Sequence, residues 1–534
     1  RVFTESVGMR SHVSKRIAYA TASLFAVLVA LASALEVRAE VSLPDVLSDS
    51  MVLQRGVRVP VWGTAAPGEA VTVSFAGQTK KAAAGADGRW RVWLDPLKAS
   101  ATPAVLTVSG ANRVELKDVL VGEVWLVSGQ SNMQFTLAET KEAAAAIAAA
   151  GHPNIRLFNV SRQVAFKHRP PPLAAWRACT PESVKDFSAA GYYFAVEIEK
   201  ELGVPVGVIN SSYGGSQAEA WTPVEYLLAS EDLKPTVERT KIWDEERPRV
   251  RAEYDEQIKK WREGADKAKA AGARPSPSPP VPDALREYRV ASSIYDGMIE
   301  PLIPFPVRGA FWYQGESNEA RAQQYNVLLP TMIRAWRERW GQGDFPFGIV
   351  QLPNYRDPKP EPTDEPWSHV REAQRRTAVS TKNAGLIVTI DVGEAHDIHP
   401  KNKLDVGRRM ARWALAEVYG RKLTATGPMF RKLKAEGPKL VLTFDGVGAG
   451  LRIRDGDKLR EFAVAGEDRK WHWAEARIVG KDKVEVWSTE VPRPVAARYA
   501  FNNNPRRPNL TNDTGLPAAP FRTDDWPDPT AGKR

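Results

Sequence analysis

The segment Gly129-Gln130-Ser131-Asn132-Met133 places a serine where an apolar strand, Val119–Ser128, gives way to a helix. Backbone N–H groups at such a junction can stabilise an oxyanion, so Ser131 is a candidate nucleophile. The alternative is that Ser131 only caps the helix. Residue 133 is Met, so the Gly-x-Ser-x-Gly pattern of a nucleophile elbow is absent, which argues against a standard α/β-hydrolase.

Two histidines, His396 and His399, follow the predicted strand Gly385–Asp391, with Asp397 between them. A histidine after one of the last strands of a sheet can serve as the general base for Ser131. The alternative is a metal site made of His396, Asp397 and His399. No other pair of His or Cys has metal-ligand spacing, so we expect neither a metal nor another cofactor.

A third polar cluster follows the predicted strand Val206–Ser211, where Tyr213 precedes Gly214 and Gly215. Paired glycines let the backbone approach a ligand closely. Gly215 could direct its N–H at an oxyanion, with Gly214 as the alternative donor. A plain turn also fits this pattern.

A fourth cluster, Gln314, Glu316 and Asn318, follows the predicted strand Gly309–Tyr313. An amide side chain can donate to an oxyanion, and a carboxylate can orient a histidine. This density of hydrogen-bonding groups at a strand end indicates a functional site.

The elements that must position these residues alternate between apolar strands and helices from about residue 119 onward. Such alternation predicts an α/β fold, with a parallel sheet covered on both faces. Ligands bind such sheets in the crevice at the carboxyl ends of the strands, which is where all four clusters fall.

The pattern of strands and helices divides the chain after residue 39 into three regions. Short strands with regular turns predict a β-sandwich over residues 40–118, and strands return in a β-rich region over 422–534. The α/β domain spans 119–421 and carries an insertion at about 224–290. Within the insertion, Asp232–Lys269 is charged and helical, and Arg274–Pro280 is a stiff, extended, proline-rich loop. A solvated helical hairpin on the rim of the domain is the simplest interpretation.

Residues 1–39 read as a secretory signal peptide. A basic stretch precedes the apolar run Ile17–Leu35, and Val37-Arg38-Ala39 is a cleavage site. A membrane anchor is the alternative, because the run is about long enough to span a bilayer. We expect a secreted or periplasmic protein that has left the membrane. Cys179 is the single cysteine, so no intrachain disulfide can form, and we interpret it as a small buried side chain.

The net charge of +10 is spread along the chain without a basic tract. It suits loose attraction to anionic glycans, and the sequence carries no nucleic-acid-binding signature. It also carries no signal for an oligomeric state.

Taken together, the motifs resemble the sialate O-acetylesterase family of the SGNH-hydrolase group. The resemblance covers most of residues 45–420. It is carried by Leu47–Arg55, by Gly122-Glu123-Val124-Trp125 leading into Gly129–Met133, by Trp312–Asn318, and by Asp397-Ile398-His399-Pro400 with Asn402-Lys403. It implies a flavodoxin-like three-layer αβα domain, metal-free hydrolysis and a β-sandwich companion.

The resemblance also implies roles. Ser131 would be the nucleophile and His399 the base, with an oxyanion hole formed by the N–H groups of Ser131 and Gly215 and an amide from Asn318 or Gln314. SGNH enzymes commonly place an Asp three residues before the base, but here that residue is His396. Glu316 or Asp397 must then orient His399, and the family resemblance favours Glu316.

The implied substrate is an O-acetylated sugar or glycan. One hypothesis is sialic acid or a related sugar, and another is an acetylated polysaccharide such as xylan. A non-catalytic carbohydrate-binding protein is the alternative from another class. Aromatic and cationic side chains are candidates for the cleft walls, namely Trp312, Tyr313, Tyr213, Trp221 and Arg371, and a structural role is the alternative for each of them.

Overall fold

The computed structural model describes residues 40–164 and 174–534, so the predicted signal peptide lies outside the described residues. The described chain forms two compact units. One contains residues 40–43, 61–92 and 107–115, and the other contains 44–60, 93–106 and 116–534 except 165–173. The predicted boundaries at 118 and 421 stay predictions.

The smaller unit is built from β-strands, of which β3 pairs antiparallel with two others. β3 (Ala70–Phe75) and β4 (Gln78–Ala83) form a hairpin whose turn residues, Ala76 and Gly77, both have positive φ, as a tight hairpin requires. β3 also pairs with the end of β6 (Ser100–Ser109), and β2 (Val59–Thr64) pairs with β5 (Arg89–Leu94). The sequence of β4, QTKKAA, does not predict a strand, because it lacks the alternation of apolar side chains that marks a half-buried strand.

The larger unit has a central sheet with the order β13-β12-β11-β7-β10-β8-β9. All pairs are parallel except β8 with β9. The strands are β7 (Arg113–Gly129), β8 (His152–Asn159), β9 (Trp176–Cys179), β10 (Val206–Ser212), β11 (Gly309–Tyr313), β12 (Phe347–Val350) and β13 (Ala384–Ile387). β1 (Val52–Gln54) pairs in parallel with the middle of β7. The predicted α/β class is confirmed by this sheet.

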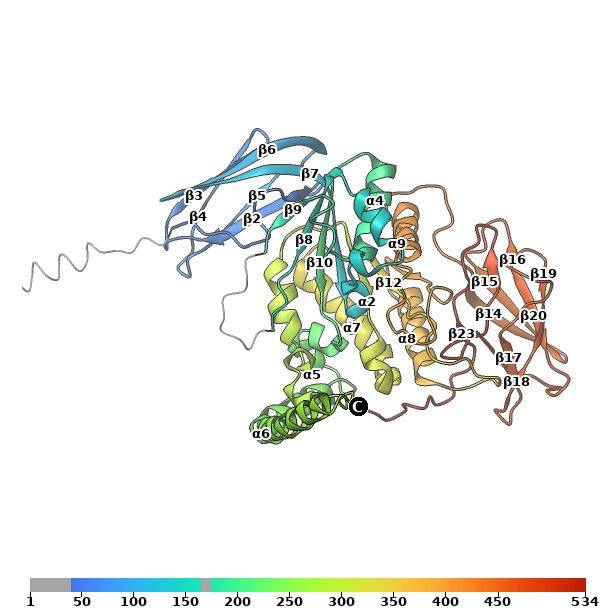
Figure 1. Cartoon of the computed structure of the whole chain (residues 1–534). Helices are drawn as coiled ribbons and strands as arrows, with labels where there is room; N and C mark the ends of the chain where they lie inside the picture. The colour runs from blue at the N-terminus through green and yellow to red at the C-terminus, as the bar shows by residue number, and fades with distance from the viewer. Residues whose placement is uncertain (1–39, 165–173) are drawn as a thin grey trace, which may run out of the picture. The chain divides into compact units, whose positions relative to one another are not determined.

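Helices cover both faces of the sheet (Figure 1). α4 (Ala189–Leu202) and α9 (Leu404–Glu417) lie on one face, and α7 (Ala322–Trp340) and α8 (Pro366–Ser380) lie on the other. The other α-helices of the described residues are α2 (Ser131–Gln134), α3 (Ala143–Ala148), α5 (Val224–Leu228) and α6 (Lys234–Ala270). Neighbouring residues of β11 show the two faces, because side chains alternate along a strand. The Phe311 ring contacts Phe194 of α4 and Trp413 of α9, whereas Trp312 contacts Trp336 of α7.

The strand order reverses direction at β7. After β7 the chain builds β8 and β10 on one side of it, and then crosses to build β11, β12 and β13 on the other. A crevice forms at the carboxyl ends of the strands where the order of a parallel sheet reverses. Ser131 follows β7, Tyr213 follows β10 and Gln314 follows β11, so three of the four predicted clusters meet at this point.

The insertion is one long helix with an extended segment lying back along it. α6 runs for 37 residues, and Trp261 Nε1 donates to the carbonyl oxygen of Ser276 at 2.8 Å. The Tyr254 hydroxyl, seven residues earlier in α6, donates to the carbonyl oxygen of Pro279 at 3.4 Å. The extended segment therefore runs antiparallel to α6. The predicted hairpin therefore has a single helical arm. α6 is long but charged, and no helix in residues 40–164 or 174–534 is apolar enough over a sufficient length to cross a bilayer.

Strands return after α9, as predicted. Two four-stranded sheets form there, β14-β15-β20-β19 and β18-β17-β21-β23, together with the pair β16-β22. The strands are β14 (Met429–Glu436), β15 (Lys439–Asp445), β16 (Leu451–Ile453), β17 (Phe462–Ala465), β18 (Trp471–Trp473), β19 (Glu475–Val479), β20 (Lys483–Trp487), β21 (Ala496–Tyr499), β22 (Leu510–Asn512) and β23 (Phe521–Arg522).

Candidate active site

Ser131 lies where β7 ends against β11. Gly129 has φ of 139°, and a Cβ at this position would collide with the carbonyl oxygen of Tyr313. The next residue, Gln130, donates its backbone N–H to the same oxygen at 3.0 Å. Only glycine fits this approach, and the chain then turns into α2 with Ser131 partly exposed and Asn132 fully buried.

The loop that carries His399 contacts the residue after Ser131. The Asn132 side-chain amide donates to the carbonyl oxygen of Ile398 at 3.0 Å. The His399 ring faces Phe135, just past the end of α2, with 6.3 Å between ring centroids. The structure therefore brings the segments of Ser131 and His399 together, although they are far apart in the sequence.

Asp397 faces His399. The Asp397 Oδ1 atom accepts the backbone N–H of His399 at 2.9 Å and lies 3.9 Å from the His399 Nδ1 atom. His396 points elsewhere, since its side chain is 83% exposed and lies 3.7 Å from Asp357. In the part of the chain that the structure describes, no three His, Cys, Asp or Glu side chains are grouped so that they could hold a metal ion.

Glu316 lies on the other side of Asn132. It begins a 3₁₀ helix, Glu316–Arg321, and its Oε1 atom accepts the Asn132 side-chain amide at 2.7 Å. Burial raises the pKa of Glu316, although the hydrogen bond from Asn132 and the charge of Lys403 oppose the shift. The sequence favoured Glu316 as the partner of His399, but in the structure Asp397 is the carboxylate beside the imidazole.

The electrostatic environment favours a neutral His399. Burial lowers the pKa of His399, and the nearby charge of Lys403 lowers it further, whereas Asp397 and Glu139 oppose the shift. A neutral imidazole is the form that can accept a proton, so His399 is suited to act as a base near neutral pH.

Lys403 is a residue of the site to which the sequence analysis assigned no role. Its side chain is fully buried, and burial lowers its pKa to about 7. Its Nζ atom donates to the Asn132 Oδ1 atom at 2.7 Å. The available signal was its place in the Asp397–Lys403 motif, four residues after His399, immediately before the amphipathic helix α9.

The loop after β10 lies against α2. Tyr213 donates its backbone N–H to the carbonyl oxygen of Gly129 at 3.0 Å, and Gly214 donates to the Gln134 Oε1 atom at 2.7 Å. A Cβ on Gly214 would lie 3.5 Å from the Ser131 Cβ atom, so this backbone passes close to the serine. The Gly214 N–H is already used within the protein, which leaves Gly215 as the better candidate for the oxyanion hole.

The side-chain amides of Gln314 and Asn318 are used within the protein. Gln314 Nε2 donates to the Asn318 Oδ1 atom at 2.7 Å and to the carbonyl oxygen of Ser216 at 3.2 Å. Asn318 Nδ2 donates to Glu219 at 2.8 Å, and Asn318 Oδ1 accepts the backbone N–H of Ala218. Both amides therefore hold the Gly215 loop in place, rather than pointing at an incoming substrate as expected from the sequence.

Of the residues proposed as cleft walls, four are buried and one is partly exposed. Trp312, Tyr313, Trp221 and Arg371 are fully buried, so none of them offers surface to a substrate in this conformation. Tyr213 is partly exposed and stacks on Tyr288, with ring centroids 4.9 Å apart and planes at 21°. Tyr288 comes from the end of the insertion, and no local pattern in the sequence predicts its meeting with Tyr213.

A cavity of about 810 Å³ adjoins α2 at Gln134. Its polar lining includes Asn159, Asn210 and Ser212 at the ends of β8 and β10, and these three side chains are hydrogen-bonded to one another. The lining also contains the charged residues Arg162, Arg177, Glu182 and Asp186. Together these hydroxyl, amide and charged groups suit a polar, hydroxyl-rich ligand.

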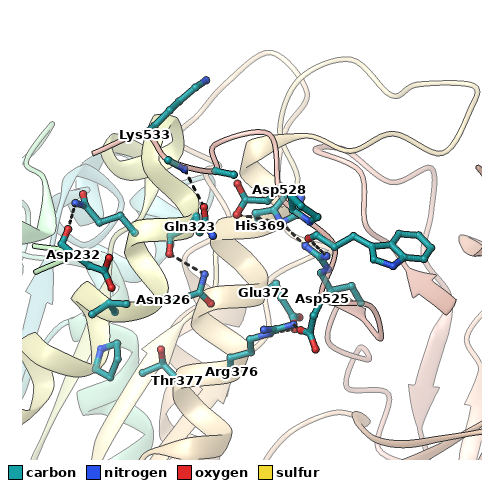
Figure 2. A pocket seen from close by; sticks show the side chains of 18 of the residues that line it. Asp232, Gln323, Asn326, His369, Glu372, Arg376, Thr377, Asp525, Asp528 and Lys533 are labelled. Carbon is teal, nitrogen blue, oxygen red and sulfur yellow. Dashed lines mark hydrogen bonds and ion pairs between the residues drawn. The ribbon is translucent and has the colours of Figure 1, made fainter. Parts of the chain in front are cut away.

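A second cavity, of about 740 Å³, lies between α7, α8 and the C-terminal residues (Figure 2). Its charged side chains pair with each other: Arg376 donates to Asp525 at 2.8 Å, and His369 lies 3.8 Å from Asp528. No residue of the loops that carry Ser131, Tyr213 and His399 lines this cavity, so it is separate from the candidate active site. The cavity beside α2 is not lined by Ser131 or His399 either, but it includes Gln134 of α2 and Ser212, which precedes Tyr213.

Comparison with known proteins supports an esterase. The family model described as carbohydrate esterase, sialic acid-specific acetylesterase matches residues 121–271 and 283–416. Human sialate O-acetylesterase is 27% identical over 517 residues, covering 89% of this chain and 91% of that protein. The mouse protein of the same name is 29% identical and covers 75% and 78%.

A solved structure supports the same conclusion. The crystal structure of a carbohydrate acetylesterase from Xanthomonas citri aligns with a TM-score of 0.76 at 36% identity, and the match covers 91% of this chain and 100% of that one. The chain is therefore a carboxylic ester hydrolase. It belongs to the carbohydrate esterase, sialic acid-specific acetylesterase family. The family model leaves out residues 272–282, which contain most of the proline-rich segment that lies along α6.

Proposed function

We propose that this protein is a serine esterase that removes O-acetyl groups from a sugar, with Ser131 as the nucleophile and His399 as the general base. The observation that carries the proposal is the hydrogen bond from Asn132 to Ile398, which joins the residue after the serine to the residue before the histidine. We also assign the sheet and its helices to the flavodoxin-like three-layer arrangement of SGNH hydrolases.

The proposed reaction has two stages. His399 takes the proton of the Ser131 hydroxyl as its oxygen attacks the acetyl carbonyl carbon, and the N–H groups of Ser131 and Gly215 stabilise the oxyanion. The bond to the sugar oxygen then breaks, and the sugar leaves with the proton from His399. Water, deprotonated by His399, attacks the acetyl-enzyme and releases acetate and the free serine.

We propose Asp397 as the carboxylate that orients His399. Its Oδ1 atom is already bonded to the His399 backbone, and the 3.9 Å to Nδ1 needs only a small movement to become a hydrogen bond. Hydrogen bonds of this kind are often long in the free enzyme and shorten in the substrate complex.

The proposed substrate is an O-acetylated sugar or glycan. We propose that the sugar occupies the polar cavity beside α2, near the partly exposed Tyr213 and Tyr288. Sialic acid is one candidate, on the names of the mammalian relatives. Acetylated polysaccharide such as xylan is the other, and the higher identity to a bacterial carbohydrate acetylesterase favours a substrate beyond sialic acid.

The test of the chemistry is hydrolysis of p-nitrophenyl acetate by the wild type and by Ser131→Ala. The variant should lose activity by a factor of about 10⁴ or more. Ser380→Ala, which changes an exposed serine at the end of α8, is the matched control and should keep full activity. A Ser131→Ala enzyme as fast as the wild type would falsify the proposal. Acetate release from acetylated sialic acid and from acetylated xylan would then separate the two substrates.

We further propose that the chain is exported by its N-terminal segment and is secreted or periplasmic. The support is the basic stretch, the apolar run and the Val37-Arg38-Ala39 site in the sequence. N-terminal sequencing of the exported protein should find Glu40 as the first residue. An uncut N-terminus on exported protein held in the membrane would instead indicate an anchor.

A further inference from the structure

Lys403 is a fully buried lysine whose side chain makes two hydrogen bonds beside the proposed base, His399. Its Nζ atom donates to the Asn132 Oδ1 atom at 2.7 Å and to the carbonyl oxygen of Pro400 at 2.6 Å. The first bond ties the beginning of α9 to α2. The second closes residues 400–403 on themselves, directly after His399.

Asn132 is held from three directions. Its Oδ1 atom accepts from Lys403, and its Nδ2 atom donates to the carbonyl oxygen of Ile398 at 3.0 Å and to the Glu316 Oε1 atom at 2.7 Å. Two of these three hydrogen bonds go to residues 398–403, which we call the histidine loop, and the third goes to Glu316. Because Asn132 follows Ser131 directly, any shift of Asn132 moves the nucleophile.

We propose that Lys403 and Glu316 are positioning residues that act through Asn132 and hold the histidine loop against α2, so that His399 meets Ser131. This inference rests on the proposed roles of Ser131 and His399. It gives Glu316 a different task from the one favoured by the sequence, because its carboxylate orients the neighbour of the serine rather than the imidazole.

The charge of Lys403 has a second effect on the site. The ammonium lies 4.6 Å from the centroid of the Phe135 ring and 5.8 Å from that of Tyr313, so aromatic rings cover it. The acidic groups that act on it are Glu316, Asp397, Glu394 and Glu139. The same ammonium helps to lower the pKa of His399, so Lys403 both places the base and keeps it unprotonated.

The first test compares Lys403→Met with Lys401→Met in the full-length protein. Methionine keeps the length of the side chain but removes the donor and the charge, while Lys401 is an exposed lysine in the same loop. With p-nitrophenyl acetate, Lys403→Met should lower kcat by about 10²-fold with little change in KM, as expected for a displaced base. The acidic limb of its pH profile should move to higher pH. Lys401→Met should match the wild type in both.

The second test separates position from charge. Asn132→Ala removes the hydrogen bonds that hold the loop but leaves the Lys403 ammonium, so kcat should fall by a similar factor while the acidic limb stays in place. The double variant Asn132→Ala/Lys403→Met should lose little more kcat than the worse single variant, because both changes break the same connection. If Lys403→Met does not fold, the Asn132→Ala measurement decides alone.

The outcomes also separate this inference from the proposed function. Full kcat and an unmoved acidic limb in Lys403→Met, or full kcat in Asn132→Ala, would overturn the positioning role even if Ser131→Ala is inactive. An active Ser131→Ala would overturn the proposed function itself. Multiplicative losses in the double variant would show that the two residues act independently, which contradicts the inference.

Discussion

The carboxylate of Asp397 holds His399 by its backbone, with Asp397 Oδ1 accepting the His399 N–H at 2.9 Å while lying 3.9 Å from the Nδ1 atom of the same residue. An aspartate two residues before the histidine can thus curl back toward the ring without the three-residue spacing common in SGNH enzymes. Glu316 contacts Asn132 instead. The two carboxylates therefore have separable tasks.

Asp397→Asn and Glu316→Gln should differ strongly in kcat. An amide at position 397 cannot stabilise the imidazolium that forms in the reaction, so we expect a loss of about 10²–10⁴-fold. Glutamine at 316 keeps an oxygen for the Asn132 amide, so its loss should stay within about tenfold. Steady-state kinetics on p-nitrophenyl acetate measure both. A severe loss in Glu316→Gln with a mild one in Asp397→Asn would return the orienting role to Glu316.

The pH dependence of kcat/KM should show an acidic limb below the ordinary histidine pKa of about 6.5. Burial and the Lys403 charge lower the pKa of His399, and the protonated imidazole cannot act as a base. Activity should therefore persist as the pH falls past 6.5 and be lost only as it passes through the lowered pKa. A limb at or above 6.5 in the wild type would contradict this assignment of His399.

Glu123 should be important for stability. Its fully buried carboxylate accepts from Arg55 at 2.5 Å and from Arg308 at 2.7 Å, and these bonds hold its pKa down against burial. Glu123→Ala leaves two guanidinium groups without their partner, so we expect a loss of about 3–5 kcal/mol in the free energy of unfolding. Urea unfolding measures this. Glu182→Ala, which breaks an exposed ion pair with Lys185, should leave the urea unfolding midpoint close to that of the wild type.

Gly129→Ala should damage both stability and catalysis. The added Cβ would collide with the Tyr313 carbonyl oxygen, so β7 and β11 must separate at the point where Ser131 begins. We expect a loss of about 1–3 kcal/mol and a marked fall in kcat. Gly264→Ala is the contrasting change. It lies within α6 with open space around it and should stabilise the protein by about 0.5–1 kcal/mol. Equal melting temperatures for the two variants would argue against the close approach at Gly129.

Local patterns in the sequence were enough to predict the strands that end at the site. The segments before Ser131, Tyr213 and Gln314 are mostly apolar, as strands buried on both faces must be. Their alternation with helices predicted a parallel sheet, and the carboxyl ends of such strands share one edge. Helix α8 carries polar residues such as Arg371 and Gln374 that are buried by tertiary contacts, so its amphipathic pattern was too weak to predict it.

The sequence by itself determined the α/β class, the strand ends that carry the candidate residues, and the motifs that resemble the family. Only the tertiary structure decided which of those residues face each other. It placed Asp397 rather than Glu316 beside His399, buried Trp312 and Arg371 away from any cleft, and drew Lys403 onto Asn132. The physical reason is that periodicity reports which side of an element is buried, whereas the partner of a polar side chain depends on loops from distant strands that meet only in the folded chain.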